Sequence, residues 1–383
     1  MGGILHVAYN AHLQQHAFEV FEKYYPGKNI MVMLPPEKGD VVKIKLTDRS
    51  KIIDYRKENT YGDILDWCKS FGVDKIMLHS LTYGKVKLVE YLKQYIECKV
   101  YWLFWGYDLY EALGEDFGVS LVDEKFNPFR LHTYYYPNKI KGYILHLKYG
   151  KTKSDVIKRG SEVVDYFCFW NKYDYDLYVK YFGDKVKYKF FGYICNEKKD
   201  AKDSDSAYVF PRKSRSIILN HQASRTGNHI TVMRKIKKID SKGIYSVYVP
   251  LSYGDSHIRR YCMRIGRKLF GEKFVPITEY LSLQEYYKII DVPETAIFGQ
   301  KRQEATGNIG HLLTVGTKVF LRQDNPLFKY YKDKGYYIFS FEQDLKTLED
   351  LNGLSEEQMI HNRQVWSTSK TYYDDFMINF FEE

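Results

Sequence analysis

The chain has 383 residues, which is too long for one core of ordinary size and indicates two domains. A hydrophobic fraction of 44% and a charged fraction of 28% are those of a folded soluble protein. The formal net charge of +10 favours anionic partners, namely nucleotide phosphates, lipid headgroups or nucleic acid, and composition does not choose among them.

Cysteine usage and hydropathy indicate the cellular compartment of the protein. The five cysteines are widely spaced, odd in number and form no CxxC, which argues against a disulfide framework or a zinc site and fits a reducing cytoplasm. The start MGGILHVAYN does not have the pattern of a signal peptide. No apolar run reaches the roughly 20 residues that span a bilayer. We therefore expect a cytoplasmic protein that meets a membrane, if at all, from its surface.

The first half alternates short apolar runs with amphipathic stretches. The runs predict buried parallel strands at Ile4–Ala8, Ile30–Leu34, Ile76–His79, Val100–Trp105, Val163–Trp170 and Val186–Phe191. The stretches between the first of them predict helices at Ala11–Tyr24, Tyr61–Phe71 and Val86–Glu97. Such alternation is typical of a doubly wound α/β domain, so residues 1–192 are interpreted as an N-terminal Rossmann-like acceptor domain.

A second alternating series follows a polar connection at residues 193–215. Strands are expected at Ser216–Leu219, Tyr245–Val249, Lys273–Val275, Thr295–Phe298, Lys318–Leu321 and Tyr337–Phe339. Helices are expected at His229–Lys238, Ser256–Phe270, Leu283–Ile290 and Ile309–Val315. Residues 216–354 then form a C-terminal Rossmann-like nucleotide-sugar donor domain, and residues 355–383 form C-terminal helices that could pack back on the first domain.

The richest polar stretch is GQKRQEATGN, between an expected strand and an expected helix. Arg302, Gln303, Gly307 and Asn308 stand just before or at the helix start. Free backbone N–H groups and the positive end of a helix suit a pyrophosphate, and Arg302 adds a bidentate phosphate donor. The alternative is a solvated loop with a capping asparagine.

Three further loops of the second half carry polar groups where strands end. The candidates there are Ser224, Arg225 and Asn228 in NHQASRTGN, Ser252, Tyr253 and Gly254 in VPLSYG, and Glu279 in PITEYL. The first set could cradle a phosphate or sugar, and the Glu279 carboxylate could accept sugar hydroxyls. Ordinary turns and helix caps are the competing interpretations.

Two residues of the first half are candidate general bases toward an acceptor hydroxyl. Asp108, in WGYDLY, follows an apolar strand, and His79, in IMLHS, ends the preceding one. A helix cap for Asp108 and a hydrogen-bonded core histidine for His79 are the alternatives. The DxD strings Asp174–Asp176 and Asp203–Asp205 do not end strands, so we interpret both as chance and expect no metal site.

Lysines alternate with tyrosines and leucines in Tyr134–Lys153. Lys139, Lys141, Lys148 and Lys151 would face a membrane surface bearing anionic lipids. The same pattern could bind single-stranded nucleic acid, or it could be a plain solvated basic face.

In order, IMLHS, WGYDLYE, ILNHQASRTGNH, VPLSYG, TEYLSLQEYYKIID, KRQEATGNIGHLL and VFLRQDNPLF resemble the successive blocks of one family. It is the 4-alpha-L-fucosyltransferase family, of the TDP-N-acetylfucosamine:lipid II N-acetylfucosaminyltransferase type that serves enterobacterial common antigen. The resemblance runs from about Ile76 to about Gly335 and is strongest from Asn220 to Phe328. The sequence departs from the family pattern in its richness in tyrosine and lysine and in a longer connection at Asn196–Ser214.

The resemblance implies a GT-B fold, with two Rossmann-like domains facing across a cleft, and no required metal or other cofactor. It implies a dTDP-linked 4-acetamido-4,6-dideoxyhexose as donor and a polyprenyl-diphosphate oligosaccharide as acceptor. The enzyme would be a hexosyltransferase of surface polysaccharide synthesis, peripheral on the inner face of the plasma membrane, with no nucleic acid as partner. Arg302 would then stabilise the leaving diphosphate, and Asp108 or His79 would deprotonate the acceptor.

Three alternatives remain open from the sequence. The chain could be a GT-B enzyme that uses another sugar nucleotide. It could be a non-catalytic basic nucleic-acid-binding protein that works through Tyr134–Lys153. It could also be a scaffold-like homologue without activity.

Overall fold

The computed structural model describes residues 2–37, 41–123, 152–195 and 208–382. They fall into two compact units, each built on its own sheet. The first unit comprises residues 2–119, 152–195 and 371–382, and the second comprises residues 120–123 and 208–370. None of the helices in these described ranges is both long and apolar enough to cross a bilayer.

The first unit contains a seven-stranded sheet in the order β3-β2-β1-β4-β5-β6-β7, and every neighbouring pair is parallel. Its strands are β1 (Gly3–Ala8), β2 (Asn29–Met33), β3 (Ser50–Ile52), β4 (Val73–His79), β5 (Lys99–Leu103), β6 (Tyr166–Cys168) and β7 (Lys187–Lys189). Its helices are α1 (His12–Tyr24), α2 (Tyr61–Ser70), α3 (Tyr83–Leu92), α4 (Tyr107–Asp116), α6 (Lys153–Gly160), α7 (Lys172–Phe182) and α14 (Asp374–Met377).

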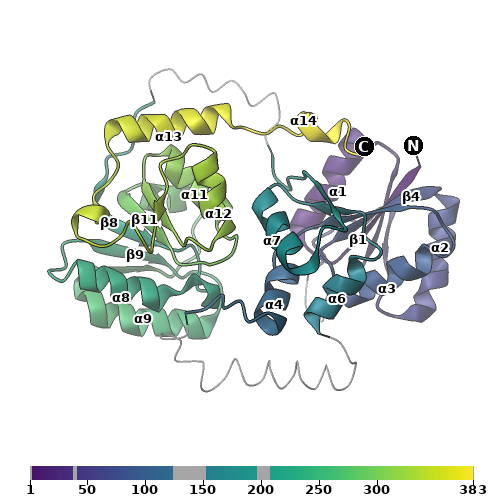
Figure 1. Ribbon diagram of the computed structural model, residues 1–383, viewed down its shortest axis with the longest axis horizontal. Coiled ribbons are helices and arrows are strands. Elements are labelled where there is room, and N and C mark those ends of the chain that lie inside the picture. Colours follow the sequence, from purple (N-terminus) through teal and green to yellow (C-terminus); the bar gives the residue numbers. More distant parts are fainter. Residues whose placement is uncertain (1, 38–40, 124–151, 196–207, 383) are drawn as a thin grey trace. The chain divides into compact units, whose positions relative to one another are not determined.

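The second unit contains a six-stranded parallel sheet in the order β10-β9-β8-β11-β12-β13. Its strands are β8 (Ser214–Leu219), β9 (Ser246–Pro250), β10 (Phe274–Ile277), β11 (Pro293–Phe298), β12 (Lys318–Leu321) and β13 (Phe339–Ser340). Its helices are α8 (His229–Ile239), α9 (Ser256–Phe270), α10 (Leu283–Ile290), α11 (Thr306–Thr314), α12 (Pro326–Asp333) and α13 (Glu356–Thr368). Helices α8 and α9 cover one face of this sheet, and α11 and α12 cover the other (Figure 1).

The central strands of both sheets are buried along most of their length, as expected for parallel strands with helices on both faces. β1 (GILHVA), for example, is buried at every position, and its Ile4 packs in one cluster with Ala17, Val20 and Phe21 of α1. The predicted strand Val100–Trp105 is shorter in the structure and ends at Leu103. Gly106 then turns the chain with φ +94° into α4, a conformation that favours glycine.

The last described residues belong to the core of the first unit. Tyr373, Met377 and Phe380 pack in one cluster with Phe21 of α1 and Phe191. Helix α13, by contrast, is part of the second unit. Residues 355–383, predicted as one segment of C-terminal helices, are thus divided between the two units near Thr371.

Candidate functional site

The strand order of the second unit reverses between β8 and β11, which are neighbours in the sheet but far apart in sequence. In open α/β sheets, ligands bind outside the carboxyl ends of the strands at such a reversal. The loops that leave β8, β9 and β11 carry most of the second-half candidates. This edge of the second sheet is therefore the candidate donor site.

Two asparagines hold the β8 and β11 loops together. The Asn220 side chain accepts a hydrogen bond from the Gly299 N–H at 2.8 Å and donates to the Gly227 carbonyl at 2.8 Å. Asn228 donates to the Gly299 carbonyl at 2.8 Å and accepts from the Asp123 N–H, also at 2.8 Å. Both side chains are buried. The backbone of both residues is left-handed, a conformation that asparagine tolerates better than most residues.

Arg302, Glu304 and Thr226 form a second link between these loops. Arg302 makes an ion pair with Glu304 through its Nε, and the Thr226 hydroxyl donates to the same carboxylate at 2.8 Å. The other carboxylate oxygen of Glu304 is buried without a hydrogen-bond partner in the described part of the chain. Sequence reasoning missed Glu304, although it lies two residues after Arg302 in the stretch that was singled out.

Helix α11 begins at Thr306, three residues before the predicted start at Ile309, so Gly307 and Asn308 lie in its first turn. The N-cap residue is Ala305, with φ +63°, and it offers no side chain to the first backbone N–H groups. Gly307 is exposed, and a Cβ built on it would meet no atom within 4 Å. The start of α11 therefore presents open donors and the positive end of a helix to an anion.

Gln303 and Asn308 are held beside this helix start. Gln303 donates to the Thr306 hydroxyl at 2.8 Å, and Asn308 donates to the Tyr286 hydroxyl at 3.3 Å. Asn325 fixes the preceding loop by donating to the carbonyls of Gln300, at 3.0 Å, and Arg302, at 2.9 Å. The loop geometry around Arg302 is thus set before any ligand arrives.

The other second-unit candidates lie on the neighbouring loops. Ser224 and Arg225 stand at the short turn Arg225–Gly227, where the Ser224 hydroxyl is 3.3 Å from that of Thr226. Ser252, Tyr253 and Gly254 follow β9, and Gly254 pairs with Ala223 of the β8 loop. Glu279 follows β10 and is exposed. The structure joins the first two groups through the Ala223–Gly254 pair.

In the first unit, His79 is fully buried at the end of β4, and its Nε2 lies 3.1 Å from Nδ1 of His6 on β1. Burial lowers the pKa of His79 well below its ordinary value, so the ring is neutral near pH 7. This is the environment of a core histidine. The His6 partner was not foreseen, because it lies 73 residues earlier on the neighbouring strand.

Asp108 lies in the first turn of α4, one residue after the helix begins. One of its carboxylate oxygens accepts from the Leu81 N–H at 3.0 Å and from the Trp102 indole at 2.7 Å. The other is buried without a hydrogen-bond partner among the described residues. Burial is the main cause that raises the pKa of Asp108 to about 6, which suits a general base near neutral pH.

Lys85 is a buried cation close to Asp108 that sequence reasoning did not single out. Its ammonium donates to the backbone carbonyl of His79 and lies 3.4 Å from that of Ser80. Burial lowers the pKa of Lys85 to about 7, and the nearby Asp108 charge opposes that shift. The loop after β4 thus connects His79, Lys85 and Asp108.

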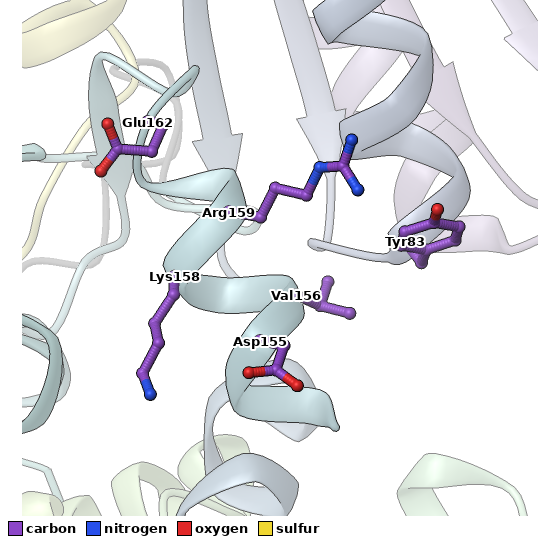
Figure 2. Close-up of a pocket in the computed structure, with 6 residues that line it drawn as sticks. All are labelled: Tyr83, Asp155, Val156, Lys158, Arg159 and Glu162. Carbon is purple, nitrogen blue, oxygen red and sulfur yellow. The ribbon is translucent and has the colours of Figure 1, made fainter. Parts of the chain in front are cut away.

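A separate hollow of about 430 Å³ in the first unit is lined by Tyr83, Asp155, Val156, Lys158, Arg159 and Glu162. Figure 2 shows Arg159 reaching from α6 toward the helix that carries Tyr83, while Lys158 points away. Arg159 is engaged by the Glu90 carboxylate, with Nη2 to Oε2 at 2.7 Å. No residue singled out from the sequence lines this hollow, and a structural ion pair accounts for its arginine.

The predicted membrane-facing lysines Lys139, Lys141, Lys148 and Lys151 lie outside the described residues, as does Asp203–Asp205. Asp174 of the other DxD string is buried and accepts a hydrogen bond from the Tyr110 hydroxyl, whereas Asp176 pairs with Lys172 at 3.5 Å. No group of three or more metal-ligating side chains occurs in the part of the chain that the structure describes.

No protein-family model matches the sequence, and no curated protein matches it. Solved structures do match over nearly the whole chain. Sucrose-phosphate synthase (tll1590) from Thermosynechococcus elongatus aligns with a TM-score of 0.58 and 8% identity, over 99% of this chain and 97% of that one. A glycosyltransferase from Rickettsia africae ESF-5 aligns with a TM-score of 0.56 and 11% identity, over 97% and 94%.

A trehalose-6-phosphate synthase aligns with a TM-score of 0.54 and 10% identity, over 95% of each chain. At such low identity these likenesses concern the fold. Together with the two parallel sheets, they confirm the predicted α/β architecture of the GT-B type.

Proposed function

We propose that the chain is a glycosyltransferase that moves a 4-acetamido-4,6-dideoxyhexose from a dTDP-sugar to a polyprenyl-diphosphate-linked oligosaccharide. The observation that carries the proposal is the start of α11 at the strand reversal of the second sheet, with open backbone donors and Arg302 beside them. The GT-B fold supports sugar transfer in general. The seven sequence blocks from Ile76 to Gly335 support the particular donor and acceptor.

Charge development explains what these groups would do. When the bond to the anomeric carbon breaks, negative charge builds on the departing diphosphate, and the sugar becomes oxocarbenium-like. The α11 N–H groups and the Arg302 guanidinium would stabilise that charge without reorganising, because Asn325 and Gln303 already fix the loop. Glu304 pairs with Arg302, and its other oxygen, which has no partner among the described residues, could accept from a further donor.

Asp108 is the better of the two candidate bases toward the acceptor hydroxyl. His79 is fully buried beside His6, and burial lowers its pKa well below the ordinary value, whereas burial raises the pKa of Asp108 to about 6. A polyprenyl-linked acceptor would place the enzyme on the inner face of the plasma membrane, within surface polysaccharide synthesis.

The test is thermal stabilisation of the full chain by a panel of nucleotides, followed by a transfer assay. We expect dTDP to stabilise the protein more than UDP, GDP or ADP. Arg302→Ala should weaken dTDP binding by about 10- to 100-fold, since a charge-assisted hydrogen bond is lost. Arg212→Ala is the matched control, because it removes an exposed arginine of the same unit away from the loops of the site.

Three outcomes would contradict parts of the proposal. Preference for another nucleotide would keep a GT-B transferase and replace the donor. Indifference to every nucleotide, with tight salt-dependent binding to oligonucleotides, would favour the nucleic-acid-binding alternative. Donor hydrolysis and transfer that are unchanged in both Arg302→Ala and Asp108→Asn would remove these residues from the mechanism.

A further inference from the structure

Helix α9 carries an unusually one-sided charge. It spans Ser256–Phe270, contains no aspartate or glutamate, and includes the cations Arg259, Arg260, Arg264, Arg267 and Lys268. Its apolar side, with Ile258 and Cys262 buried, packs into the core of the second unit. Arg260, Arg264 and Arg267 follow the spacing i, i+4, i+7, so they share the opposite, exposed face.

These arginines line an open groove of about 600 Å³, together with Met263 and Thr278. Arg259 donates to the Thr278 carbonyl at 2.9 Å, and Arg260 lies 2.9 Å from Nδ1 of His257. Arg264 lies over the Tyr261 ring at 5.2 Å. None of the five α9 cations forms an ion pair with a residue that the structure describes, so their charge is not neutralised within the described chain.

The neighbouring helix extends the same charge. α8 packs beside α9 (Figure 1) and also contains no acidic residue. Its cations are Arg234, Lys235, Lys237 and Lys238, of which Arg234 and Lys238 are exposed. Two adjacent helices thus carry nine basic residues and no acidic one, and the exposed members are Arg234, Lys238, Arg260, Arg264, Arg267 and Lys268. We call this surface, formed by the basic residues of α8 and α9, the cationic helix pair.

Apolar side chains stand exposed in the chain segment that leaves the groove. Thr278 lines the groove, and two residues later Tyr280 is 89% exposed. Leu283, the first residue of α10, is 63% exposed. Neither side chain contributes to the core of the unit. An aromatic ring and a leucine beside a cationic surface are the combination that suits the boundary between lipid headgroups and acyl chains.

We propose that the cationic helix pair, with Tyr280 and Leu283, docks on a membrane surface of anionic phospholipids. Arginine forks match phosphate oxygens in bidentate geometry, and several forks in one groove can hold several headgroups. Leu283 favours lipid over nucleic acid, because a leucine inserts among acyl chains but does not stack on bases. The inference deepens the proposed membrane location and rests on it, but it does not depend on which sugar is transferred.

The experiment is co-sedimentation of the full chain with vesicles, without any acceptor lipid. We expect binding to phosphatidylcholine vesicles that contain phosphatidylglycerol, weakening as salt rises, and little binding to phosphatidylcholine alone. The triple variant Arg260→Gln, Arg264→Gln, Arg267→Gln should bind on the order of 100-fold more weakly, from the attraction of each cation to an anionic surface. Leu283→Ser should weaken binding without changing its salt dependence.

The matched control removes the same charge elsewhere. Lys28, Lys43 and Lys45 are exposed lysines of the first unit, and their triple replacement by Gln should leave vesicle binding within about twofold. Equal losses in both triple variants, or no binding of the wild type to the anionic vesicles, would overturn the proposal. So would oligonucleotide binding that is lost in the arginine variant while vesicle binding is absent. Stabilisation by dTDP should survive in the arginine variant, which separates a failure of docking from a failure of the donor site.

Discussion

The side-chain amide of Asn220 bridges Gly299 and Gly227, with both hydrogen bonds at 2.8 Å. It thereby joins the loop after β8 to the loop after β11, the two strands between which the second sheet reverses its order. Both hydrogen bonds are made to backbone groups, so they fix the backbone conformation of the two loops and not only the position of a side chain. The backbone conformation of these loops in turn determines where Arg302 lies relative to Thr226.

Removing this bridge should cost stability. Asn220→Ala would leave two buried backbone groups without partners, and we expect the free energy of unfolding to fall by about 2–4 kcal/mol in a urea titration. Asn220→Asp keeps an acceptor for the Gly299 N–H but loses the donor to Gly227, so its loss should be smaller. Asn220→Gly also loses both hydrogen bonds, but glycine adopts the left-handed conformation without strain. Its loss of stability therefore measures the contribution of the hydrogen bonds alone. A loss confined to the Ala variant would assign the effect to backbone strain alone.

Two glycines with positive φ provide a matched pair. Gly254, with φ +105°, approaches the β8 loop so closely that an added Cβ would lie 2.3 Å from the Ala223 carbonyl oxygen. Gly243, with φ +70°, has no atom within 4 Å of the same position. Gly243→Ala should cost about 1 kcal/mol of stability, and Gly254→Ala about 2 kcal/mol more, since its neighbour must move.

Thermal melts with and without dTDP would test whether the clash also disturbs the site. We expect reduced stabilisation by dTDP in Gly254→Ala and unchanged stabilisation in Gly243→Ala. Equal melting temperatures for the two variants would show that the close approach of the β8 and β9 loops carries no energy.

The buried carboxyl of Asp108 makes stability depend on pH. Its pKa of about 6 in the folded state lies above the ordinary value of 3.8, so the folded protein holds the proton more tightly than the unfolded chain. The stabilisation is complete below pH 3.8 and is lost as pH rises through about 6, a difference of about 3 kcal/mol. Asp108→Asn should remove this pH dependence. The stability of the variant relative to the wild type should therefore increase as pH rises from 4 to 7.

Urea unfolding of both proteins across that pH range measures the two free energies of unfolding. If both depend on pH in the same way, the raised pKa of Asp108 is refuted.

The same variant also tests the role of Asp108 in transfer. Loss of transfer in a folded Asp108→Asn protein is expected if the carboxylate is the base, whereas retained transfer leaves it a structural partner of Trp102.

Phe380 and Ile378 separate core packing from surface exposure within one short segment. Phe380 is 1% exposed in the core of the first unit, and Ile378 is 59% exposed. We expect Phe380→Ala to lower the free energy of unfolding by about 3 kcal/mol or more and Ile378→Ala to change it by less than about 0.5 kcal/mol. Similar small effects from both would mean that residues 371–382 are not needed for that core.

Much of the fold could be predicted because buried parallel strands read as continuous apolar runs. The helices Ser256–Phe270 and Leu283–Ile290 were predicted to the residue. In the first, Asp255 accepts from the N–H groups of the opening turn, and Gly271 follows the last residue with φ +57°. Such local signals need no knowledge of the rest of the chain.

Features that depend on distant partners could not be predicted. His79 meets His6 across adjacent strands, and Glu304 meets Thr226 across 78 residues, so neither contact leaves a periodic pattern. Helix α4, at Tyr107–Asp116, is absent from the predicted elements, because the apolar run continues to Trp105 and hides the turn at Gly106. The roles of the second-half candidates in donor binding stay predictions.

Synthesis order gives the tail an additional consequence. Phe21 emerges from the ribosome early, but Phe380, against which it packs edge-on, is made more than three hundred residues later. The first unit, whose synthesis begins first, therefore receives its last core residues only after the whole sheet of the second unit has been translated. We expect part of its aromatic surface to stay exposed during that interval, so nascent chains arrested before Thr371 should be more sensitive to protease in the first unit than in the second.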